Sequence, residues 1–440
     1  MTAEDGSAGR LRGAIDHDAV LVLAVMLGIY LVFAVAGALL GFDVNGVANV
    51  LRRVTFLTAV YALLTLGLNL QWGYTGLFNI GVAGFMAVGV YVTAILTRPV
   101  VRVGEDVPIG FGVPGFDLPL AVAVVAGVVA AALAGALVAL PALRLRSDYL
   151  AIATIGLAET VRLSLQSETF GDVALFGYRF GTGGGRGIAT PTNPVRGLFF
   201  SEPATASAPT ALGRAVFGAT RSIGLEPNVV VGWAYALVLL AVVAAAYWLL
   251  ARMARSPFGR VLKAIREDER VAQALGKPTP RFKLVAFAVG CGLMGLAGIL
   301  WRGSQGTVYP DVFVPEFTFF VWIALIVGGA SSNTGSVLGA AAFAGLLWEG
   351  PRYANDLANR ALDVGATPDT FLEALGPLAA LDPGPLATYV LAELSGSLRI
   401  VLVGVLLILL MQRRPEGLLG WRTESAAAVD LDRDAGEVER

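Results

Sequence analysis

Residues 255–283 read RSPFGRVLKAIREDERVAQALGKPTPRFK, and this charged stretch separates two apolar runs at 229–250 and 284–300. Both runs are close to the length of roughly 20 residues that a helix needs to cross a bilayer. The loop between them, 251–283, carries nine basic and three acidic side chains. Because loops rich in Lys and Arg stay on the cytoplasmic side, the stretch predicts a cytoplasmic loop between two membrane-spanning helices.

The composition of the whole chain agrees with a membrane protein. Of its 440 residues, 56% are hydrophobic and only 15% are charged, and the mean hydropathy is +0.71. A typical soluble domain is about 25% charged, so the composition excludes an ordinary soluble enzyme. The 33 acidic and 32 basic residues nearly cancel, which excludes a nucleic-acid binder that works through a strongly basic face.

Ten apolar runs along the chain are candidate crossings: 19–40, 54–70, 77–96, 118–140, 149–165, 229–250, 284–300, 317–327, 337–348 and 398–411. We therefore predict an all-α polytopic membrane protein of about ten transmembrane helices within residues 19–411. The first run could be a signal peptide, but it is longer than the usual apolar segment of about 7 to 15 residues, which favours an uncleaved span.

Glycines shape the predicted bundle in two ways. They recur at close spacing in the runs around 81–89 and 290–298, where small residues allow helix backbones to approach closely. A glycine- and serine-rich break at 328–336 also separates two runs of only about half the required length. These runs are either half-helices beside a permeation path, where a broken backbone is tolerated, or helices joined by an ordinary short loop.

Counting crossings outward from the basic loop gives the orientation. Both termini are then cytoplasmic: the polar segment 1–18, and the acidic segment 412–440, which lacks the apolar residues for a core and is expected to be disordered. Arg144 and Arg146 fall inside and agree with the positive-inside rule, whereas Arg52 and Arg53 fall outside and disagree. Segments 166–228 and 349–397 are predicted to be external.

The basic loop has the features of a folded element. Ser256 and Pro257 are a plausible helix start, apolar residues recur at helical spacing from 260 to 275, and Gly276 followed by Pro278 is a common helix stop. We expect a short amphipathic helix pair. A loop that only anchors the chain at the membrane surface would not require these boundaries, so they favour a docking element for a cytoplasmic partner.

This loop is similar to the coupling loop of the branched-chain amino acid permease family of ABC importers, through GRVLKAIREDE at 259–269 and onward to Gly276. Four further stretches resemble family motifs in the same order: GLNLQWGYTGLFNIG at 67–81, LRLRSDYLAIAT at 143–154, TGGGRGI at 182–188 and GSVLGA at 335–340. Together they cover roughly residues 54–344. Ser147, Arg186 and the long segment 349–397 depart from the family pattern.

The resemblance implies an ABC importer permease fold and a multi-pass protein of the plasma membrane that imports leucine, isoleucine and valine. Its partners would be a second homologous permease, two ATP-binding subunits, an external substrate-binding protein and the lipid bilayer, and no nucleic acid. The loop would dock in a groove of an ATP-binding subunit through Gly259, Lys263, Ala264, Ile265, Arg266, Glu267, Asp268, Ala272, Leu275 and Gly276. Arg266, Glu267 and Asp268 would set the register by charge, and the apolar side chains would supply contact area.

The chain has no catalytic motif of its own. Its only Gly-Lys pair, Gly276-Lys277, is followed by Pro278, so the phosphate-binding loop G-x-x-x-x-G-K-[ST] is missing. ATP and Mg are therefore expected on the partner subunits, and no cofactor on this chain. The single His17 lies before the first span and Cys291 is the single cysteine, so we expect no metal site.

Polar residues within or beside the spans are candidates for the translocation path. Unpaired polar groups are costly in an apolar environment, so they either line a cavity or bond to neighbouring helices. The candidates are Asn69, Gln71, Tyr74, Thr75 and Asn79. Glu159 and Arg162 lie three residues apart, on one helix face, and are expected to pair with each other.

Three other functions remain open from the residues. A urea or short-chain amide importer has similar motifs, and the sequence does not separate it from a branched-chain amino acid importer. An ion-coupled secondary transporter requires functional ionisable residues in the membrane, and Glu159 is the only acidic residue well inside a predicted span, beside Arg162. A membrane scaffold without transport is opposed by the docking loop.

Overall fold

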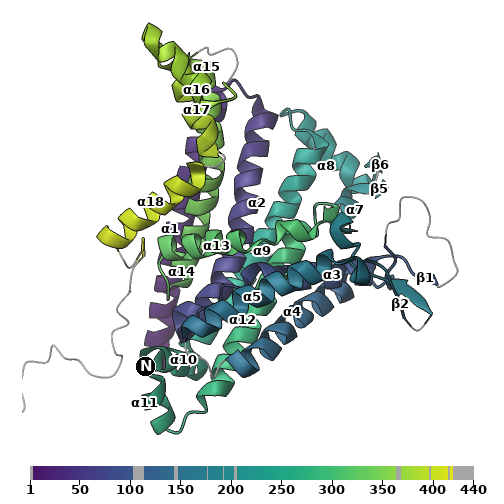
Figure 1. Cartoon of the computed structure of the whole chain (residues 1–440), viewed down its shortest axis with the longest axis vertical. Coiled ribbons are helices and arrows are strands. Elements are labelled where there is room, and N and C mark those ends of the chain that lie inside the picture. The colour runs from purple at the N-terminus through teal and green to yellow at the C-terminus, as the bar shows by residue number, and fades with distance from the viewer. Residues whose placement is uncertain are drawn as a thin grey trace, which may run out of the picture.

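A computed structural model of the chain describes residues 3–102, 113–142, 147–175, 177–191, 193–202, 206–362, 368–395, 398–414 and 417–419. Most of these residues are helical, and the strands among them are at most three residues long (Figure 1). The prediction of an all-α fold is confirmed. Arg144, Arg146 and residues 420–440 of the acidic segment lie outside the described residues.

The first half of the chain forms α1 (Ala3–Leu39), α2 (Val44–Leu68), η1 (Asn69–Gly73), α3 (Val82–Thr97), α4 (Leu120–Ala142) and α5 (Ser147–Gln166). The polar segment 1–18 and the first apolar run are thus joined in one helix from Ala3 onward. A short turn then leads to Asp43, whose carboxylate accepts a hydrogen bond from the amide of Gly46 at 2.8 Å and begins α2. The η1 segment is a π-helical continuation of α2.

The second half contains α9 (Pro227–Arg255), α10 (Pro257–Glu267), α11 (Glu269–Ala274), α12 (Thr279–Arg302), α13 (Pro315–Gly328), α14 (Asn333–Ala342) and the π-helical η4 (Phe343–Glu349). It ends with α15 (Gly350–Leu362), α16 (Phe371–Leu375), η5 (Gly376–Ala380), α17 (Gly384–Ser395) and α18 (Leu398–Arg413). The expected break between two short helices is present, but it is confined to residues 329–332.

Six helical segments among the described residues are long and apolar enough to cross a membrane: Asp18–Leu39, Val44–Gly73, Leu120–Leu140, Pro227–Arg255, Thr279–Arg302 and Pro310–Gly328. The remaining predicted crossings form α3, α5, α14 and α18. Of these, α3, α14 and α18 are shorter than the 18 residues of a full apolar window, and α5 is less apolar because it carries Glu159 and Arg162. The chain is therefore polytopic, with several short helices.

The core is centred on α2. In this span 94% of the apolar window is buried, against 17% in α1 and 22% in α4, so α2 lies inside the bundle and the other two at its periphery (Figure 1). α2 packs against α9, α12 and α14. Its side chains Tyr61, Leu63 and Leu64 are fully buried, and the Tyr61 ring contacts the ring of Phe343 with centroids 4.8 Å apart.

Helices α3, α4 and α12 form a tightly packed group, as the glycine spacing predicts. A Cβ atom added at Gly89 on α3 would lie 2.6 Å from the Cα of Gly295 on α12. One added at Gly298 would lie 2.5 Å from the carbonyl oxygen of Met86. Only residues without a side chain allow these two backbones to touch.

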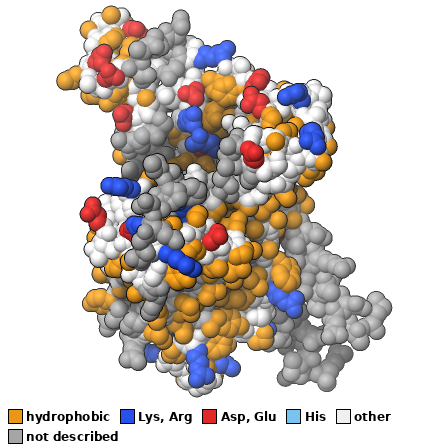
Figure 2. Space-filling model, turned by 90° about the vertical axis from the view of Figure 1, so that its right-hand side faces the viewer, with side chains coloured by type: hydrophobic (Ala, Val, Ile, Leu, Met, Phe, Trp, Pro, Cys, Tyr) orange, Lys and Arg blue, Asp and Glu red, His pale blue; other side chains and the backbone are white. Residues whose placement is uncertain are grey.

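Three small antiparallel sheets lie away from the loop helices. β3 (Tyr178–Phe180) pairs with β1 (Val101–Arg102) and β2 (Val173–Leu175), β4 (Ile188–Ala189) with β7 (Thr307–Val308), and β5 (Phe200–Glu202) with β6 (Ser207–Pro209). In Figure 1, β5 and β6 lie beside α8 (Ala211–Arg221) and β1 and β2 lie lower on the same side of the view, whereas α10 and α11 lie at the lower end of the molecule and α15–α17 at the upper end. Figure 2 shows hydrophobic side chains over a broad area between charged groups at both ends.

Candidate functional site

The helix pair α10–α11 begins at the predicted residues. The Ser256 hydroxyl accepts a hydrogen bond from the amide of Gly259 at 3.4 Å, and Pro257 occupies the first turn of α10. A Cβ atom at Gly259 would lie 2.2 Å from the carbonyl oxygen of Ala254, so only glycine permits this sharp junction with α9. The chain therefore turns abruptly from the long span α9 into the loop helix.

The two loop helices meet at Asp268. Its carboxylate accepts hydrogen bonds from the amides of Arg270 at 2.8 Å and Val271 at 3.2 Å, which makes it the N-cap of α11. The pair ends at Gly276, where φ is +74°, and the amide of Lys277 donates to the carbonyl of Ala272 at 3.1 Å. The predicted helix pair and its glycine stop are confirmed.

One face of the pair packs on the chain's own bundle. The side chains of Leu262, Ile265 and Ala272 are buried, and the ring of Phe258 stacks on that of Phe282 with centroids 5.1 Å apart. Three of the predicted docking residues, Gly259, Ile265 and Ala272, are therefore internal in this chain. They position the helix pair and offer no surface.

The opposite face is open. Ala264, Glu267, Asp268, Leu275 and Gly276 are exposed. Leu275 is 71% exposed and Val271 55%, so two large apolar side chains face outward among charged ones. Lys263 is half-buried, with its ammonium 5.8 Å from the centre of the Tyr74 ring. The open face thus combines apolar area with charge, as a docking surface requires.

Helix α11 is tied to the start of α12 by a compact polar cluster. The Glu269 carboxylate accepts from the ammonium of Lys283 at 2.9 Å and from the hydroxyl of Thr279 at 3.0 Å. The Gln273 amide donates to the same hydroxyl at 3.0 Å. Since Thr279 and Lys283 are buried, these bonds hold the helix pair to the bundle.

The five polar candidates for the path are all buried and bonded within the chain. The Gln71 amide donates to the carbonyl of Phe287 at 2.9 Å and accepts from the Asn79 amide at 2.8 Å. The Thr75 hydroxyl donates to the carbonyl of Leu70 at 3.0 Å. The bond from Gln71 to Phe287 joins two helices, as one of the two alternatives predicts, whereas the other two bonds are local. A role of these residues in a path stays a prediction.

Asn69 and Tyr74 bond across the break. The Asn69 amide donates to the side-chain oxygen of Asn333 at 3.0 Å, and the Tyr74 hydroxyl donates to the same oxygen at 3.3 Å. The Asn69 oxygen accepts from the amide of Ser331 at 2.8 Å. Segments that are more than 250 residues apart along the chain are thereby joined.

Arg266 turns inward from α10. Its guanidinium donates to the carbonyl of Gly73 at 2.7 Å and to the hydroxyl of Ser331, and it also pairs with Glu267 at 2.6 Å. The Arg266 side chain is only 18% exposed, whereas that of Glu267 is 62% exposed. Of the three charges expected to face a partner, the structure directs Glu267 and Asp268 outward and Arg266 into the chain.

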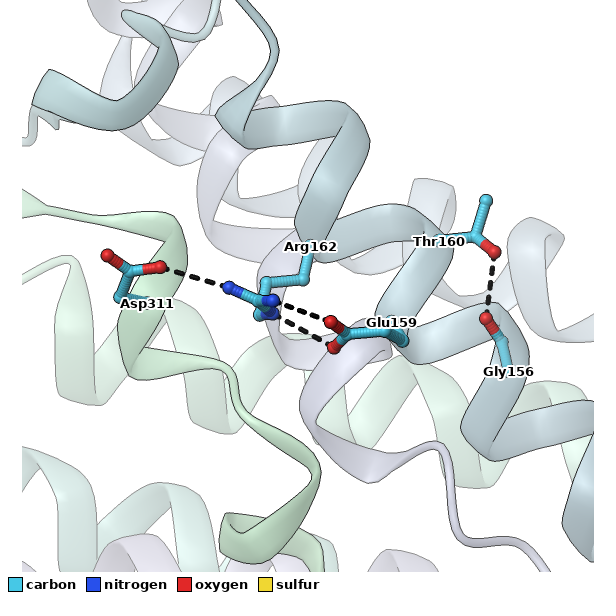
Figure 3. A network of polar contacts seen from close by, with 5 residues as sticks. All are labelled: Gly156, Glu159, Thr160, Arg162 and Asp311. Atoms are coloured by element: carbon cyan, nitrogen blue, oxygen red, sulfur yellow. Dashed lines mark hydrogen bonds and ion pairs between the residues drawn. The ribbon is translucent and has the colours of Figure 1, made fainter.

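Glu159 and Arg162 pair as expected, and a third residue joins them (Figure 3). The Arg162 guanidinium donates to the Glu159 carboxylate at 2.9 Å and to the carboxylate of Asp311 at 3.0 Å. The network ties α5 to the short η3 turn (Pro310–Val312). A carboxylate held by a guanidinium in this way serves as a structural tie.

Two buried carboxylates were missed from the sequence. Asp18 accepts from the hydroxyl of Thr334 at 2.9 Å, and Glu349 accepts from the guanidinium of Arg53 at 2.7 Å. Asp18 directly precedes an apolar run and Glu349 directly follows one, and at such edges an acidic residue is usually taken for a solvated helix end. Arg53, which the predicted orientation places outside, is thus paired with a buried carboxylate. Arg52 bonds to Asn49 at 2.7 Å.

An apolar pocket of about 360 Å³ lies beside the break, between α13 and α18. It is lined by Trp72, Phe78, Ile80, Phe319, Trp322, Ile323, Ile326, Ala330, Leu407 and Met411. None of the five polar path candidates lies in this lining. Trp322 links the pocket to the polar core, because its indole N–H donates to the carbonyl of Asn79 at 3.0 Å.

Comparison with known proteins gives relatives for most of this architecture. The high-affinity branched-chain amino acid transport system permease protein LivM of Escherichia coli (strain K12) is 35% identical over 288 residues, 65% of this chain and 60% of the relative. The probable branched-chain amino acid transport permease protein LivM of Methanocaldococcus jannaschii is 26% identical over 299 residues, 64% of this chain and 75% of the relative. The autoinducer 2 import system permease protein LsrC of Photorhabdus laumondii is 30% identical over 112 residues, 25% of this chain and 31% of the relative.

The matched region spans less than two thirds of the Escherichia coli relative, at 60% of its length. No solved structure matches the chain. The family described as "Branched-chain amino acid transport system / permease component" matches residues 50–348, which is more than half of the 440 residues and includes α2 to α14. The chain therefore belongs to the branched-chain amino acid transport system permease family.

Proposed function

We propose that this chain is the membrane permease subunit of an ATP-driven ABC importer for leucine, isoleucine and valine, in the plasma membrane with both termini cytoplasmic. The observation that carries the proposal is the helix pair α10–α11. It is packed on the bundle through Leu262 and Ile265, tied to α12 through Glu269, and open on its other face. A partner that moved this pair would move the bundle with it.

The proposed partner at the open face is a cytoplasmic ATP-binding subunit, of which the complex would hold two. Val271 and Leu275 would enter its groove, and Glu267 and Asp268 would fix the register through opposite charges on the partner. ATP and Mg would be bound by those subunits, which hydrolyse the nucleotide. This chain would follow their closure as a rigid body because its loop helices are fastened to α12.

A second homologous permease and an external substrate-binding protein complete the proposed assembly. The names of the two LivM relatives support branched-chain amino acids as the substrate. The name of the LsrC relative, an autoinducer 2 import permease, shows that similar chains serve other ligands. In such an importer the binding protein would select the ligand and the permease would provide the passage.

Uptake into proteoliposomes that hold the assembled complex tests the proposal. Labelled leucine, isoleucine, valine and urea are supplied with their binding proteins, with and without internal ATP. Wild type is compared with Glu267→Arg and Leu275→Asp on the open face, and with Glu226→Arg, an exposed acidic residue before α9, as the matched charge reversal. We expect ATP-dependent leucine uptake that the two loop variants lose and the control keeps.

Each other outcome has a definite meaning. Uptake of urea alone would show that the assembly is an importer with a different class of substrate. Uptake that needs no ATPase and follows an imposed ion gradient would overturn the proposal. If the loop variants kept full uptake and bound the ATP-binding subunits as tightly as wild type, the open face of α10–α11 would not be the docking surface.

A further inference from the structure

Arg266 connects the loop helix to the interior of the membrane domain. It lies in the last turn of α10, yet its guanidinium bonds to Gly73 at the end of η1 and to Ser331 in the break between α13 and α14. These partners are 193 and 65 residues away along the chain. The Arg266 side chain therefore joins three elements: the loop helix α10, the π-helical end η1 of the central span, and the break between α13 and α14.

The break that Arg266 contacts has unusual backbone angles. Ser331 has φ +72° and Gly329 has φ +102°, and L side chains rarely adopt such angles. Ser331 is held there by two bonds: its amide donates to the Asn69 oxygen at 2.8 Å, and its hydroxyl donates to the Gly73 carbonyl at 2.8 Å. The Gly73 carbonyl thus accepts from both Arg266 and Ser331.

The junction is too crowded to slide. A Cβ atom at Gly73 would lie 2.0 Å from the Asn69 oxygen and 2.7 Å from the amide nitrogen of Ser331. A Cβ atom at Gly76, where φ is +72°, would lie 3.5 Å from the Cγ of Arg266. Because η1 and the break are in close contact at Gly73, and Arg266 bonds to both, a displacement of α10 would be passed to the break.

The bonds continue beyond the break into α14. Asn333 accepts from both Asn69 and Tyr74, and the Thr65 hydroxyl on α2 donates to the carbonyl of Ser336 at 3.0 Å. The start of α14 and the end of α2 are therefore fastened at three points. A change at Ser331 would shift both helices together.

We propose that Arg266 is a positioning residue that transmits the movement of α10 to the break at residues 329–332, so that ATP-driven docking changes the backbone between α13 and α14. This rests on the proposed function, because it assumes that an ATP-binding subunit moves the helix pair. A guanidinium suits the role because its Nη1 donates to both Gly73 and Ser331 while its Nε and Nη2 donate to Glu267, which fixes the planar group from two sides. An ammonium has a single nitrogen and lacks this second arm. The uncommon backbone angles at Gly329 and Ser331 are of the kind that clusters at switch regions.

The test uses the assembled complex and three measurements: co-purification of the ATP-binding subunits, ATP hydrolysis, and leucine uptake per ATP hydrolysed. In Arg266→Ala we expect co-purification and hydrolysis to persist while uptake per ATP falls about tenfold, as for loss of a charged hydrogen bond. Arg266→Lys should restore part of the loss. The control Arg270→Ala removes an exposed arginine four residues on and should change the ratio less than about twofold.

A double-mutant cycle shows whether Arg266 acts through Ser331. Ser331→Ala should lower uptake per ATP in the same direction. The double variant should lose less than the two single losses combined, because each single variant already removes the contact between Arg266 and Ser331. Additive losses would overturn the inference. If Arg266→Ala does not fold, Ser331→Ala and Arg266→Lys are used for the test. Both leave Gly73 unchanged, and the first keeps a small side chain at 331 while the second keeps a basic one at 266.

The failure of this inference differs from the failure of the proposed function. If wild type neither binds ATP-binding subunits nor needs ATP, the proposed function is wrong. If wild type does both, and Arg266→Ala and Ser331→Ala leave uptake per ATP at the wild-type value, the helix pair still docks but Arg266 does not transmit its movement.

Discussion

At the scale of single residues, the two members of the Arg53–Glu349 pair lie in different surroundings. The Glu349 side chain is 2% exposed, whereas that of Arg53 is 48% exposed. A charge left alone in the interior is much more costly than one left at the surface. The two residues should therefore respond unequally to loss of the partner, although they share one ion pair.

We expect Arg53→Ala to destabilise the protein more than Glu349→Gln. The first leaves a buried carboxylate without its cation and should cost about 3 kcal/mol, while the second keeps an acceptor for a half-exposed arginine and should cost about 1 kcal/mol. Thermal unfolding of the purified permease in detergent measures both, with Arg52→Ala as the neighbouring arginine. Equal losses from both variants would contradict this account.

At the scale of elements, the side chain of Asp268 caps the start of α11. Asp268 accepts two backbone hydrogen bonds and begins α11. Asp268→Ala should weaken α11 by about 1 kcal/mol, which corresponds to about fivefold faster hydrogen exchange in residues 270–274. Asp268→Asn keeps a capping oxygen and should exchange as wild type. Unchanged exchange in the alanine variant would show that α11 is held by tertiary contacts alone.

The contact between α3 and α12 gives a second prediction at this scale. Gly89→Ala places a methyl group about where the Gly295 backbone lies, so the two helices must separate, at a cost of about 1 to 3 kcal/mol. Gly156 on α5 is the matched control, because a Cβ atom there has no neighbour within 4 Å. The unfolding midpoints of Gly89→Ala and Gly156→Ala should differ by several degrees in a thermal shift measurement. Similar midpoints would contradict the close packing of α3 on α12.

The loop elements were predictable because their signals are local. Ser256, Pro257 and Gly276 act on the backbone within a few residues, and the structure has the helix start and stop where they stand. The apolar spacing also gave the buried face at Leu262 and Ile265. The pair of helices was predicted without a residue at which they divide, although Asp268 before an acidic first turn is itself an N-cap signal.

The direction of Arg266 could not be predicted, because it is set by partners far along the chain. In the sequence it is one of five consecutive charged residues at 266–270, a pattern typical of a solvated face. Its acceptors lie in a π-helical end at Gly73, which has no spacing signal, and in the break at Ser331. The break was predicted, but its sequence does not say which distant side chain bonds to it. The five polar path candidates were predicted either to line a cavity or to bond to neighbouring helices, and their spacing did not say which helix each would meet.

At the scale of the whole molecule, the chain returns to its middle after α18. The amides of Leu418 and Leu419 donate to the carbonyls of Val327 and Gly328 at 2.8 and 3.2 Å, at the end of α13. These carbonyls belong to the last turn of a helix and have no partner within it. The segment 417–419 thus bonds to the carbonyls just before the break, whereas Arg266 bonds to Ser331 within it.

Deletion variants test this contact. Removal of residues 415–440 should expose the two carbonyls. The loss of two backbone hydrogen bonds should lower the free energy of unfolding by about 1 to 2 kcal/mol, and with it the unfolding midpoint. Removal of 421–440 leaves the contact in place and should match the full chain. If both deletions have the same midpoint, the segment contributes nothing to the stability of the break.

The burial of α2 has a consequence for how the protein is made. α2 has the lowest mean hydropathy of the six spans, 1.5 against 2.8 for α1, because its surface meets protein and not lipid. A helix of this kind enters the lipid phase weakly when the ribosome first presents it. Since only residues 40–43 separate it from α1, the two helices are expected to be inserted as a hairpin, with the strongly apolar α1 carrying its partner into the bilayer before the rest of the bundle encloses it.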